Sequence, residues 1–397
     1  MNKTQSKTAA GSHGKDAAVS IGAKIVLDEA GIAELFGVLA KVGYETVGPC
    51  VRDGAVVYDK ISSPKDLPIG VSDEQSGGQY RLTKGTPNAY FEYVVGPTSW
   101  KKYLFPPRQK LLHVTHKDKG FTVKTVLKDE KPYAFVGVRP CELAAIQIQD
   151  KVFGYDPENG PAEIADPGYC ARRSKVLLIA VNCSRAGKNC FCASMGTGPQ
   201  ATKEQGYDIL MTEIADRDRH DFIVEAGTKR GTLVLDVLSR RKATENDLRA
   251  AENVLARARR QISKAMVPEV DKLLKKNLEH PRWEDVAKRC LACANCTMAC
   301  PTCFCNTVEE VTELSGDHSE RWRLWDSCFS IDFSYIHGGA IRREVSSRYR
   351  QWMTHKLSNW HDQFGTSGCV GCGRCITWCP VGIDITEEAK AIKYTSR

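Results

Sequence analysis

The residues best suited to chemistry are cysteines in two runs of identical spacing. The first run extends from Cys290 to Pro301 and the second from Cys369 to Pro380, and both read C-x2-C-x2-C-x3-C-P. Three thiolates at this spacing can bind three corners of a cubane [4Fe–4S] cluster from one tight loop, while the Cys before the Pro commonly binds the other cluster. The pattern therefore predicts two clusters, held by Cys290, Cys293, Cys296 and Cys379 and by Cys369, Cys372, Cys375 and Cys300.

Zinc and disulfides are the alternatives for a chain with 17 cysteines among 397 residues. Structural zinc sites usually present two pairs of Cys or His, rather than three Cys in one turn followed by a fourth Cys and a Pro. The clustered spacings also favour thiolate ligands over disulfides, which indicates a reducing compartment. A zinc-stapled scaffold or nucleic-acid-binding module stays open as the alternative from another class of protein.

A third group of cysteines follows two predicted strands in the N-terminal half. The apolar runs 133–138 and 176–181 read as buried strands, and each delivers a Cys just beyond its carboxyl end, where open α/β sheets form ligand crevices. Three thiols then lie in one Gly-containing loop after the second strand. We expect a third [4Fe–4S] cluster there, with buried free thiols or zinc as alternatives. Its expected ligands are Cys183, Cys190, Cys192 and Cys141, with Cys170 and Cys50 as rivals for the fourth position.

Three further cysteines, Cys303, Cys305 and Cys328, lie close to or between the two runs. We expect them to be packing residues, because a free Cys behaves as a small hydrophobe. No catalytic residue is predicted, since the sequence has no G-x-G-x-x-G after a strand, no G-x-x-x-x-G-K-S/T, no H-E-x-x-H and no G-x-S-x-G. Cluster ligands without substrate chemistry are typical of a protein that carries electrons.

The elements that must position these thiols fall into two kinds. Hydrophobic periodicity predicts an α/β N-terminal domain and an α-helical, ferredoxin-like C-terminal domain with two [4Fe–4S] cassettes. Asp53-Gly54 between β-rich runs predicts a hairpin, and Thr244 with Asp247 predicts a capped helix start. The stretch between the cassettes is expected to be helical, chiefly from 341 to 360. The expected division is a disordered tail at 1–19, the α/β domain at 20–240, a helical linker at 241–282 and the two-cluster domain at 283–397.

Charge and hydropathy add little about partners. The net charge of +8 is spread over basic runs without interleaved aromatic residues, which favours a solvated surface over nucleic-acid binding. No stretch approaches the roughly 20 apolar residues needed to cross a bilayer. The first residues have no apolar core of a secretory signal. We therefore expect a cytoplasmic protein with no direct membrane insertion and no nucleic acid.

Several segments together resemble the iron–sulfur β subunits of the cytoplasmic NAD(P)-linked [NiFe] hydrogenases, also called sulfhydrogenases. The resemblance is carried by Gly96–Pro107, Arg139–Glu142, Cys183–Cys192, Cys290–Cys305, Ser334–Gly339 and Phe364–Asp384. It implies a non-catalytic chain with three [4Fe–4S] clusters. Such a chain relays electrons between an FAD- and NAD(P)-binding flavoprotein and the small subunit of a [NiFe] hydrogenase, which is paired with the large subunit. The related electron-transfer subunit of anaerobic sulfite reductase is the alternative.

Overall fold

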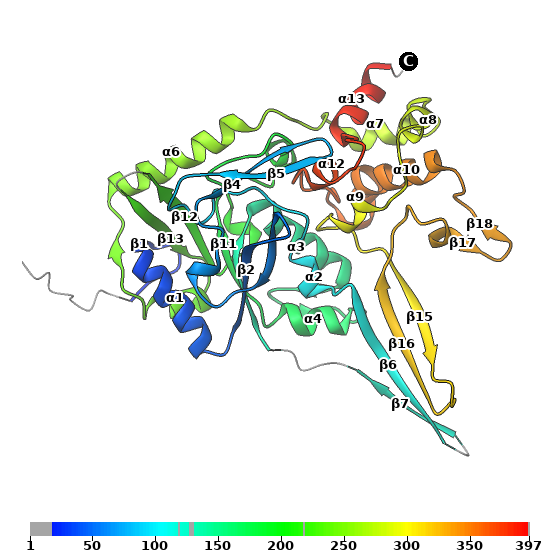
Figure 1. Cartoon of the computed structure of the whole chain (residues 1–397), viewed down its shortest axis with the longest axis horizontal. Helices are drawn as coiled ribbons and strands as arrows, with labels where there is room; N and C mark the ends of the chain where they lie inside the picture. The colour runs from blue at the N-terminus through cyan, green and yellow to red at the C-terminus, as the bar shows by residue number, and fades with distance from the viewer. Residues whose placement is uncertain (1–17, 118–119, 127–130, 217–218, 396–397) are drawn as a thin grey trace, which may run out of the picture.

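The computed structural model describes residues 18–117, 120–126, 131–216 and 219–395, so the predicted tail at 1–19 lies almost wholly outside the described residues. An eight-stranded sheet forms the centre of the N-terminal half (Figure 1). In order across the sheet its strands are β14 (Arg241–Lys242), β1 (Lys24–Asp28), β13 (His220–Ala226), β12 (Ile209–Ala215), β11 (Leu177–Val181), β8 (Tyr133–Val138), β2 (Glu45–Arg52) and β3 (Ala55–Lys60).

The four neighbouring strands β12, β11, β8 and β2 are parallel, and the outer strands pair antiparallel. This confirms the α/β prediction for the N-terminal half. Parallel neighbours end at the same edge of a sheet, so the residues after β8 and β11 lie side by side there. The predicted hairpin is also confirmed, because β2 and β3 are joined through Asp53 and Gly54, whose φ angles are 49° and 73°.

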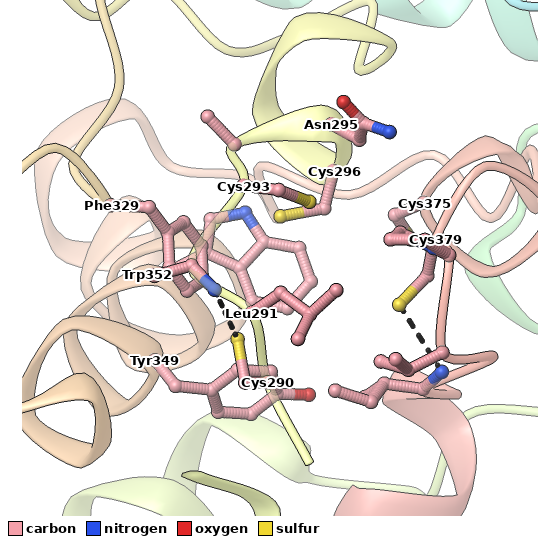
Figure 2. A pocket seen from close by; sticks show the side chains of 15 residues that line it. Cys290, Leu291, Cys293, Asn295, Cys296, Phe329, Tyr349, Trp352, Cys375 and Cys379 are labelled. Atoms are coloured by element: carbon pink, nitrogen blue, oxygen red, sulfur yellow. Dashed lines mark hydrogen bonds between the residues drawn. The ribbon is translucent and has the colours of Figure 1, made fainter.

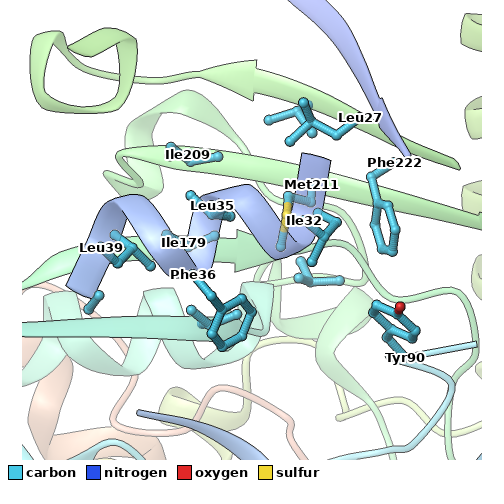
Figure 3. Close-up of a cluster of buried hydrophobic side chains, with 14 of the residues drawn as sticks. Leu27, Ile32, Leu35, Phe36, Leu39, Tyr90, Ile179, Ile209, Met211 and Phe222 are labelled. Carbon is cyan, nitrogen blue, oxygen red and sulfur yellow. The ribbon is translucent and has the colours of Figure 1, made fainter. Parts of the chain in front are cut away.

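Helices cover both faces of this sheet. Helix α1 (Glu29–Lys41) begins where the Asp28 side chain accepts the Gly31 N–H, and its buried residues Ile32, Leu35 and Leu39 pack on one face (Figure 3). Helices α3 (Pro140–Phe153) and α4 (Pro167–Arg173) contribute to the core on the other face. The remaining N-terminal elements are α2 (Lys101–Leu104), α5 (Lys229–Leu235), the hairpin β4 (Val71–Ser76) with β5 (Gln79–Lys84), and β9 (Tyr155–Asp156) with β10 (Gly160–Pro161).

The stretch between the cassettes corrects the helical prediction. Its first half is a hairpin, β15 (Asn306–Thr312) with β16 (His318–Trp325), which extends β6 (Arg108–Lys117) and β7 (Gly120–Thr125) into a four-stranded antiparallel sheet projecting from the body (Figure 1). The hairpin is stable because β16 pairs with β6, a strand about 200 residues away in the sequence, which a local pattern could not predict. A small hairpin, β17 (Tyr335–Ile336) with β18 (Gly339–Ala340), follows.

Helices build the rest of the C-terminal half, as expected. Helix α10 (Val345–Thr354) continues through a π-helical turn, η5 (His355–Asn359), into α11 (Trp360–Phe364), four residues later than the predicted start at 341. Helix α10 and the π-helical turn share a core with α7 (Val270–Lys276), α8 (Arg282–Ala287) and α13 (Ile385–Thr395), whereas Trp360 of α11 belongs to a separate hydrophobic cluster. Helix α6 (Glu245–Gln261) has the predicted capping box and packs instead on the main sheet.

Candidate iron–sulfur sites

The two cassettes have the same backbone shape at equivalent positions. In the first, Ala292 and Ala294 have φ angles of 48° and 67°; in the second, Gly371 and Gly373 have 64° and 79°. These left-handed residues alternate with the Cys residues and curl each loop around its thiols. The N–H of the first left-handed residue donates to the preceding thiol in both, Ala292 to Cys290 and Gly371 to Cys369, each at 3.4 Å. Such N–H···S bonds are a common way for proteins to set cluster potentials.

The first cassette lines a cavity with the four thiols predicted for it (Figure 2). Cys290 and Cys293 come from the loop that leads into α9 (Asn295–Met298), Cys296 lies in α9 itself, and Cys379 comes from the loop after α12 (Arg374–Thr377). The cavity is closed by the aromatic side chains of Phe329, Tyr349 and Trp352, and Cys375 of the second cassette also lines it. The structure thus brings together the thiols of one run with the last Cys of the other.

Two buried donors in this cavity, Tyr349 Oη and Trp352 Nε1, have no hydrogen-bond partner among the residues that the structure describes. An unsatisfied buried donor costs about 1–3 kcal/mol, so native proteins almost always satisfy one. The sulfides and thiolates of a [4Fe–4S] cluster are acceptors that would satisfy both. The thiols and the orphaned donors therefore fit the cluster that the sequence predicts.

Replacing Tyr349 with Phe removes one of these donors while preserving the ring. We expect a more negative reduction potential for the cluster of the first cassette, because a donor to its sulfur stabilises the more negative, reduced state. The loss in unfolding free energy should be about 0.5–1.5 kcal/mol. Redox titration followed by electron paramagnetic resonance checks the potential. Tyr394→Phe, at an 80% exposed position, is the matched control, and equal potentials in both variants would contradict the prediction.

The second cassette lies directly against the N-terminal cysteine loop. A Cβ atom at Gly371 would come within 2.7 Å of the Cys192 backbone, and one at Gly373 within 2.6 Å of the Asn189 carbonyl oxygen. The Phe191 N–H donates to the Gly371 carbonyl at 2.9 Å. The two glycines thus allow the loops to touch, whereas the first cassette has alanines at these positions. Burial raises the pKa of Cys369 to about 12.

The predicted fourth thiol of the second cassette is held by a buried lysine. Lys356 Nζ donates to Cys300 Sγ at 3.4 Å, to Thr302 Oγ1 at 3.1 Å and to the Gly368 carbonyl at 3.2 Å. Contact with Cys303 and the charge of Lys356 hold the pKa of the Cys300 thiol well below its usual range, against the effect of burial. Through Lys356, Cys300 is thus connected to the backbone of Gly368, the residue before the second cassette.

The N-terminal cysteines converge at the edge of the main sheet. Cys141, Cys190 and Cys192 are buried in one cluster that also contains Cys372 of the second cassette. Burial and then the neighbouring thiol charges of Cys372 and Cys192 raise the pKa of Cys141. Cys183 follows β11, the strand beside β8, and its thiol charge acts on Cys190 and Cys192.

The two rivals for the fourth position lie elsewhere. Cys50 belongs to the core under α1, and Cys170 is buried on the opposite face, where its thiol donates to the Phe153 carbonyl at 3.9 Å. Cys141 is therefore the Cys that accompanies the loop thiols.

The spacing of the thiols bears on the zinc alternative. In the part of the chain that the structure describes, no three Cys, His, Asp or Glu side chains lie close enough to bind one metal ion. Tetrahedral zinc, with Zn–S bonds of about 2.3 Å, brings its thiolates within about 4 Å of each other. The thiolates of a cubane lie farther apart, because the cluster occupies the space between them. A cubane can therefore be held by thiols that lie too far apart to bind one zinc ion.

A buried charge network connects the second cassette with the strand ends. Arg374, between two of its cysteines, forms an ion pair with Glu142, and both side chains are at most 1% exposed. Arg374 also donates to the carbonyls of Gly96 and Thr98, at 2.9 and 3.0 Å. Glu142 accepts further hydrogen bonds from Tyr58 Oη at 2.7 Å and from a tryptophan ring. Arg374 thereby ties the cassette to the residue next to Cys141.

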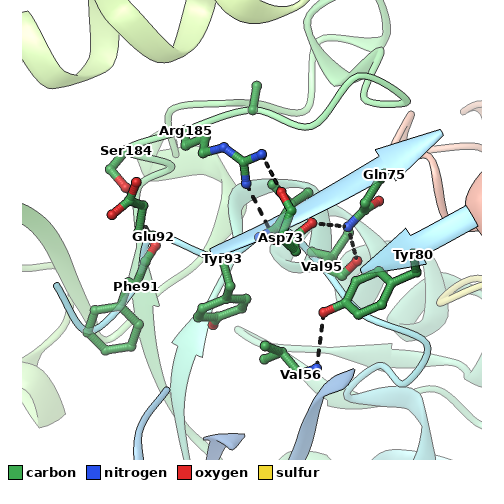
Figure 4. Close-up of polar contacts among 12 residues, drawn as sticks. Val56, Asp73, Gln75, Tyr80, Phe91, Glu92, Tyr93, Val95, Ser184 and Arg185 are labelled. Atoms are coloured by element: carbon green, nitrogen blue, oxygen red, sulfur yellow. Dashed lines mark hydrogen bonds and ion pairs between the residues drawn. The ribbon is translucent and has the colours of Figure 1, made fainter. Parts of the chain in front are cut away.

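A second network fixes the start of the N-terminal cysteine loop (Figure 4). Arg185 forms an ion pair with the fully buried Asp73, which also accepts the Val94 N–H at 2.6 Å and a bond from Gln75 at 2.8 Å. Arg139 lies nearby and donates to the carbonyl of Tyr93 at 2.9 Å. These bonds hold the backbone on either side of the loop. The position of the loop thiols is therefore fixed by a buried ion pair and buried hydrogen bonds.

The sequence did not predict the polar residues around the thiols. Tyr349, Trp352, Lys356 and Arg374 are distant in sequence from most of the thiols they approach, and only their burial and orientation identify them. Only Arg374 had a signal in the sequence. It is a charged residue between two predicted cluster ligands, and a loop that surrounds a cluster is expected to be buried.

Comparison with known proteins agrees with this arrangement. Residues 289–383 match the family described as 4Fe-4S dicluster domain. The chain is 28% identical over 357 residues to sulfhydrogenase 2 subunit beta of Pyrococcus furiosus, a match that covers 88% of this chain and 92% of the relative. No helix in the described residues is long and apolar enough to span a membrane. The similarity over most of both chains, with the dicluster match, agrees with the resemblance found in the sequence: the chain is an iron–sulfur electron-transfer subunit that is similar to sulfhydrogenase β subunits.

Proposed function

We propose that this chain relays electrons between an FAD- and NAD(P)-binding flavoprotein and the small subunit of a [NiFe] hydrogenase. The carriers would be [4Fe–4S] clusters at the first cassette, the second cassette and the N-terminal site. Bound clusters of this type supply one-electron redox centres. The chain itself would have no hydrogenase activity.

The observation that carries the proposal is the position of the second cassette between the other two sites. Cys375 lines the cavity of the first cassette, while Cys372 belongs to the buried group that includes Cys141, Cys190 and Cys192. The second cassette therefore shares a boundary with each neighbour. A continuous series of redox sites is what a relay requires.

The side chains around the sites exclude water and hold the ligand loops in place. Aromatic residues close the first cavity, and Phe191, fully buried, lies where the N-terminal loop meets the second cassette. The buried cation Arg374 stands beside Cys372, where it offsets the negative charge of thiolate ligands. These residues would limit the rearrangement that accompanies each change of charge.

The partners are tested by anaerobic purification of the chain from cells that express its neighbouring genes. We expect a flavoprotein and both subunits of a [NiFe] hydrogenase to co-purify, and hydrogen-dependent reduction of NAD or NADP by the complex. The isolated chain should not oxidise hydrogen. Co-purification of a sirohaem protein in place of the hydrogenase would contradict the proposal and support the sulfite reductase alternative.

The N-terminal cluster is tested by replacing Cys183 with Ser. We expect the loss of about four iron atoms per chain, the content of one [4Fe–4S] cluster, because this loop supplies most of the ligands. Iron analysis and absorption spectra of anaerobically prepared protein provide the measurement. Cys50→Ser, at a buried thiol far from this loop, is the control. Equal iron in both variants would show that the N-terminal thiols bind no cluster.

A further inference from the structure

Three cysteines outside the predicted ligand sets lie together beside the second cassette. The antiparallel ladder of β15 and β16 ends at the pair Asn306 and Trp325, and the Asp326 N–H donates to the Cys305 carbonyl at 2.9 Å. The hairpin thereby brings its two ends together, and the thiols of Cys305 and Cys328 lie close enough for each to shift the pKa of the other. Cys303 comes two residues before Cys305, and both Cys300 and Cys305 act on its thiol.

Two buried lysines lie beside this thiol group and Cys300. Lys101 and Lys356 are each 4% exposed, and among the described residues neither has a carboxylate within ion-pair distance. Lys101 Nζ lies 3.5 Å from the carbonyl oxygens of Thr297 and Met298 and 3.9 Å from the ring centre of Trp325. The nearest groups that can carry negative charge are thiols: Cys303, Cys300 and Cys305 act on Lys101, and Cys300, Cys303 and Cys369 on Lys356.

Buried ammonium groups require an anion. Removing a charge from water costs several kcal/mol unless it is paired, so two such groups beside neutral thiols would be a severe penalty. As ligands of the second cassette, Cys300 and Cys369 provide thiolates to Lys356, but of these two Cys300 alone also acts on Lys101. Thiolates that bind iron stay deprotonated, because the metal replaces the proton, and would supply the remaining charge.

We propose that Cys303, Cys305 and Cys328 bind an additional iron–sulfur cluster, with Lys101 and Lys356 compensating its negative charge. Cys300 remains a ligand of the second cassette and lies between the two clusters. The additional cluster therefore has three thiolate ligands, and one of its iron positions has none. This assignment replaces the sequence-based prediction that the three are packing residues. It holds whichever protein partners the chain has.

The test is iron analysis of the full chain, purified anaerobically, with Cys303, Cys305 and Cys328 replaced together by Ser. We expect the loss of about four iron atoms per chain, with the paramagnetic signals of the other clusters retained. The double variant Cys50→Ser and Cys170→Ser, which removes two buried thiols that lie in the hydrophobic cores, should lose none.

A single Cys328→Ser variant provides a second test in case the triple variant misfolds. Cys328 lies in a loop outside both cassettes, so its replacement should disturb the fold least. It should lose the same iron and keep the circular dichroism spectrum of the wild type. Unchanged iron in both variants would overturn the proposal. Loss of iron from several clusters at once in Cys328→Ser would overturn it too, because the thiols would then support the existing clusters. A wild type without iron would instead contradict the proposed function.

Discussion

Replacing Arg374 with Met is expected to destabilise the protein by about 3–5 kcal/mol, the usual cost of removing one partner from a buried ion pair. Glu142 would remain buried with its charge, without a cation, although Tyr58, Trp100 and the Arg139 N–H would still donate to it. The bonds from Arg374 to two carbonyls of the N-terminal half would also be lost. Anaerobic urea unfolding, followed by circular dichroism, measures the change.

An exposed ion pair serves as a control that separates the effect of burial on stability from the effect of removing a charge. Arg321 forms an ion pair with Glu310 on the projecting sheet, where the two side chains are 47% and 54% exposed. Arg321→Met should therefore cost less than about 1 kcal/mol. Adding Glu142→Gln to Arg374→Met should recover part of the loss, since the buried charge is then gone. Equal destabilisation by Arg374→Met and Arg321→Met would contradict the proposed role of burial.

The same variant should change the redox behaviour. Burial raises the pKa of Cys372, and the charge of Arg374 opposes that rise, which means that Arg374 stabilises negative charge at this ligand. Reduction adds negative charge to a cluster, so removal of the cation should make the potential of the second cassette more negative. A double substitution that restored stability but not the potential would separate these two roles.

Local signals explain which features could be predicted from the sequence. The strands that precede Cys141 and Cys183 are continuous apolar runs, and the parallel sheet brings their ends together as such runs predict. The start of α6 was readable because Thr244 and Asp247 cap each other within one turn. In each case the interacting residues lie within a few positions of one another or follow a general rule of sheet geometry.

The features that could not be predicted depend on contacts between distant segments. The hairpin of β15 and β16 was mistaken for part of a helical stretch because its stability comes from pairing with β6. Lys101 and Lys356 read as ordinary surface lysines in the sequence, yet both are buried near the same thiols. The lack of a carboxylate partner, which makes them informative, can be recognised only in three dimensions.

Replacing Gly371 with Ala is expected to separate the second cassette from the N-terminal cysteine loop. The new Cβ would lie 2.7 Å from backbone atoms of Phe191 and Cys192, and backbone cannot move aside as a flexible side chain can. Forcing the loops apart should cost about 1–3 kcal/mol and weaken the hydrogen bond from Phe191 to Gly371. Electron transfer between the two sites should slow, because its rate falls steeply with distance. Flash reduction followed by optical absorption would measure that rate.

The first cassette provides the control within the same chain. Ala292 occupies the equivalent position with a φ of 48°, so an alanine is tolerated in this left-handed conformation. Ala292→Gly should leave electron transfer unchanged. A defect in Gly371→Ala that is absent from Ala292→Gly would then arise from the contact with Cys192, since the backbone conformation is shared. If Gly371→Ala instead transferred electrons at the wild-type rate, the close approach of the two loops would not be needed for the relay.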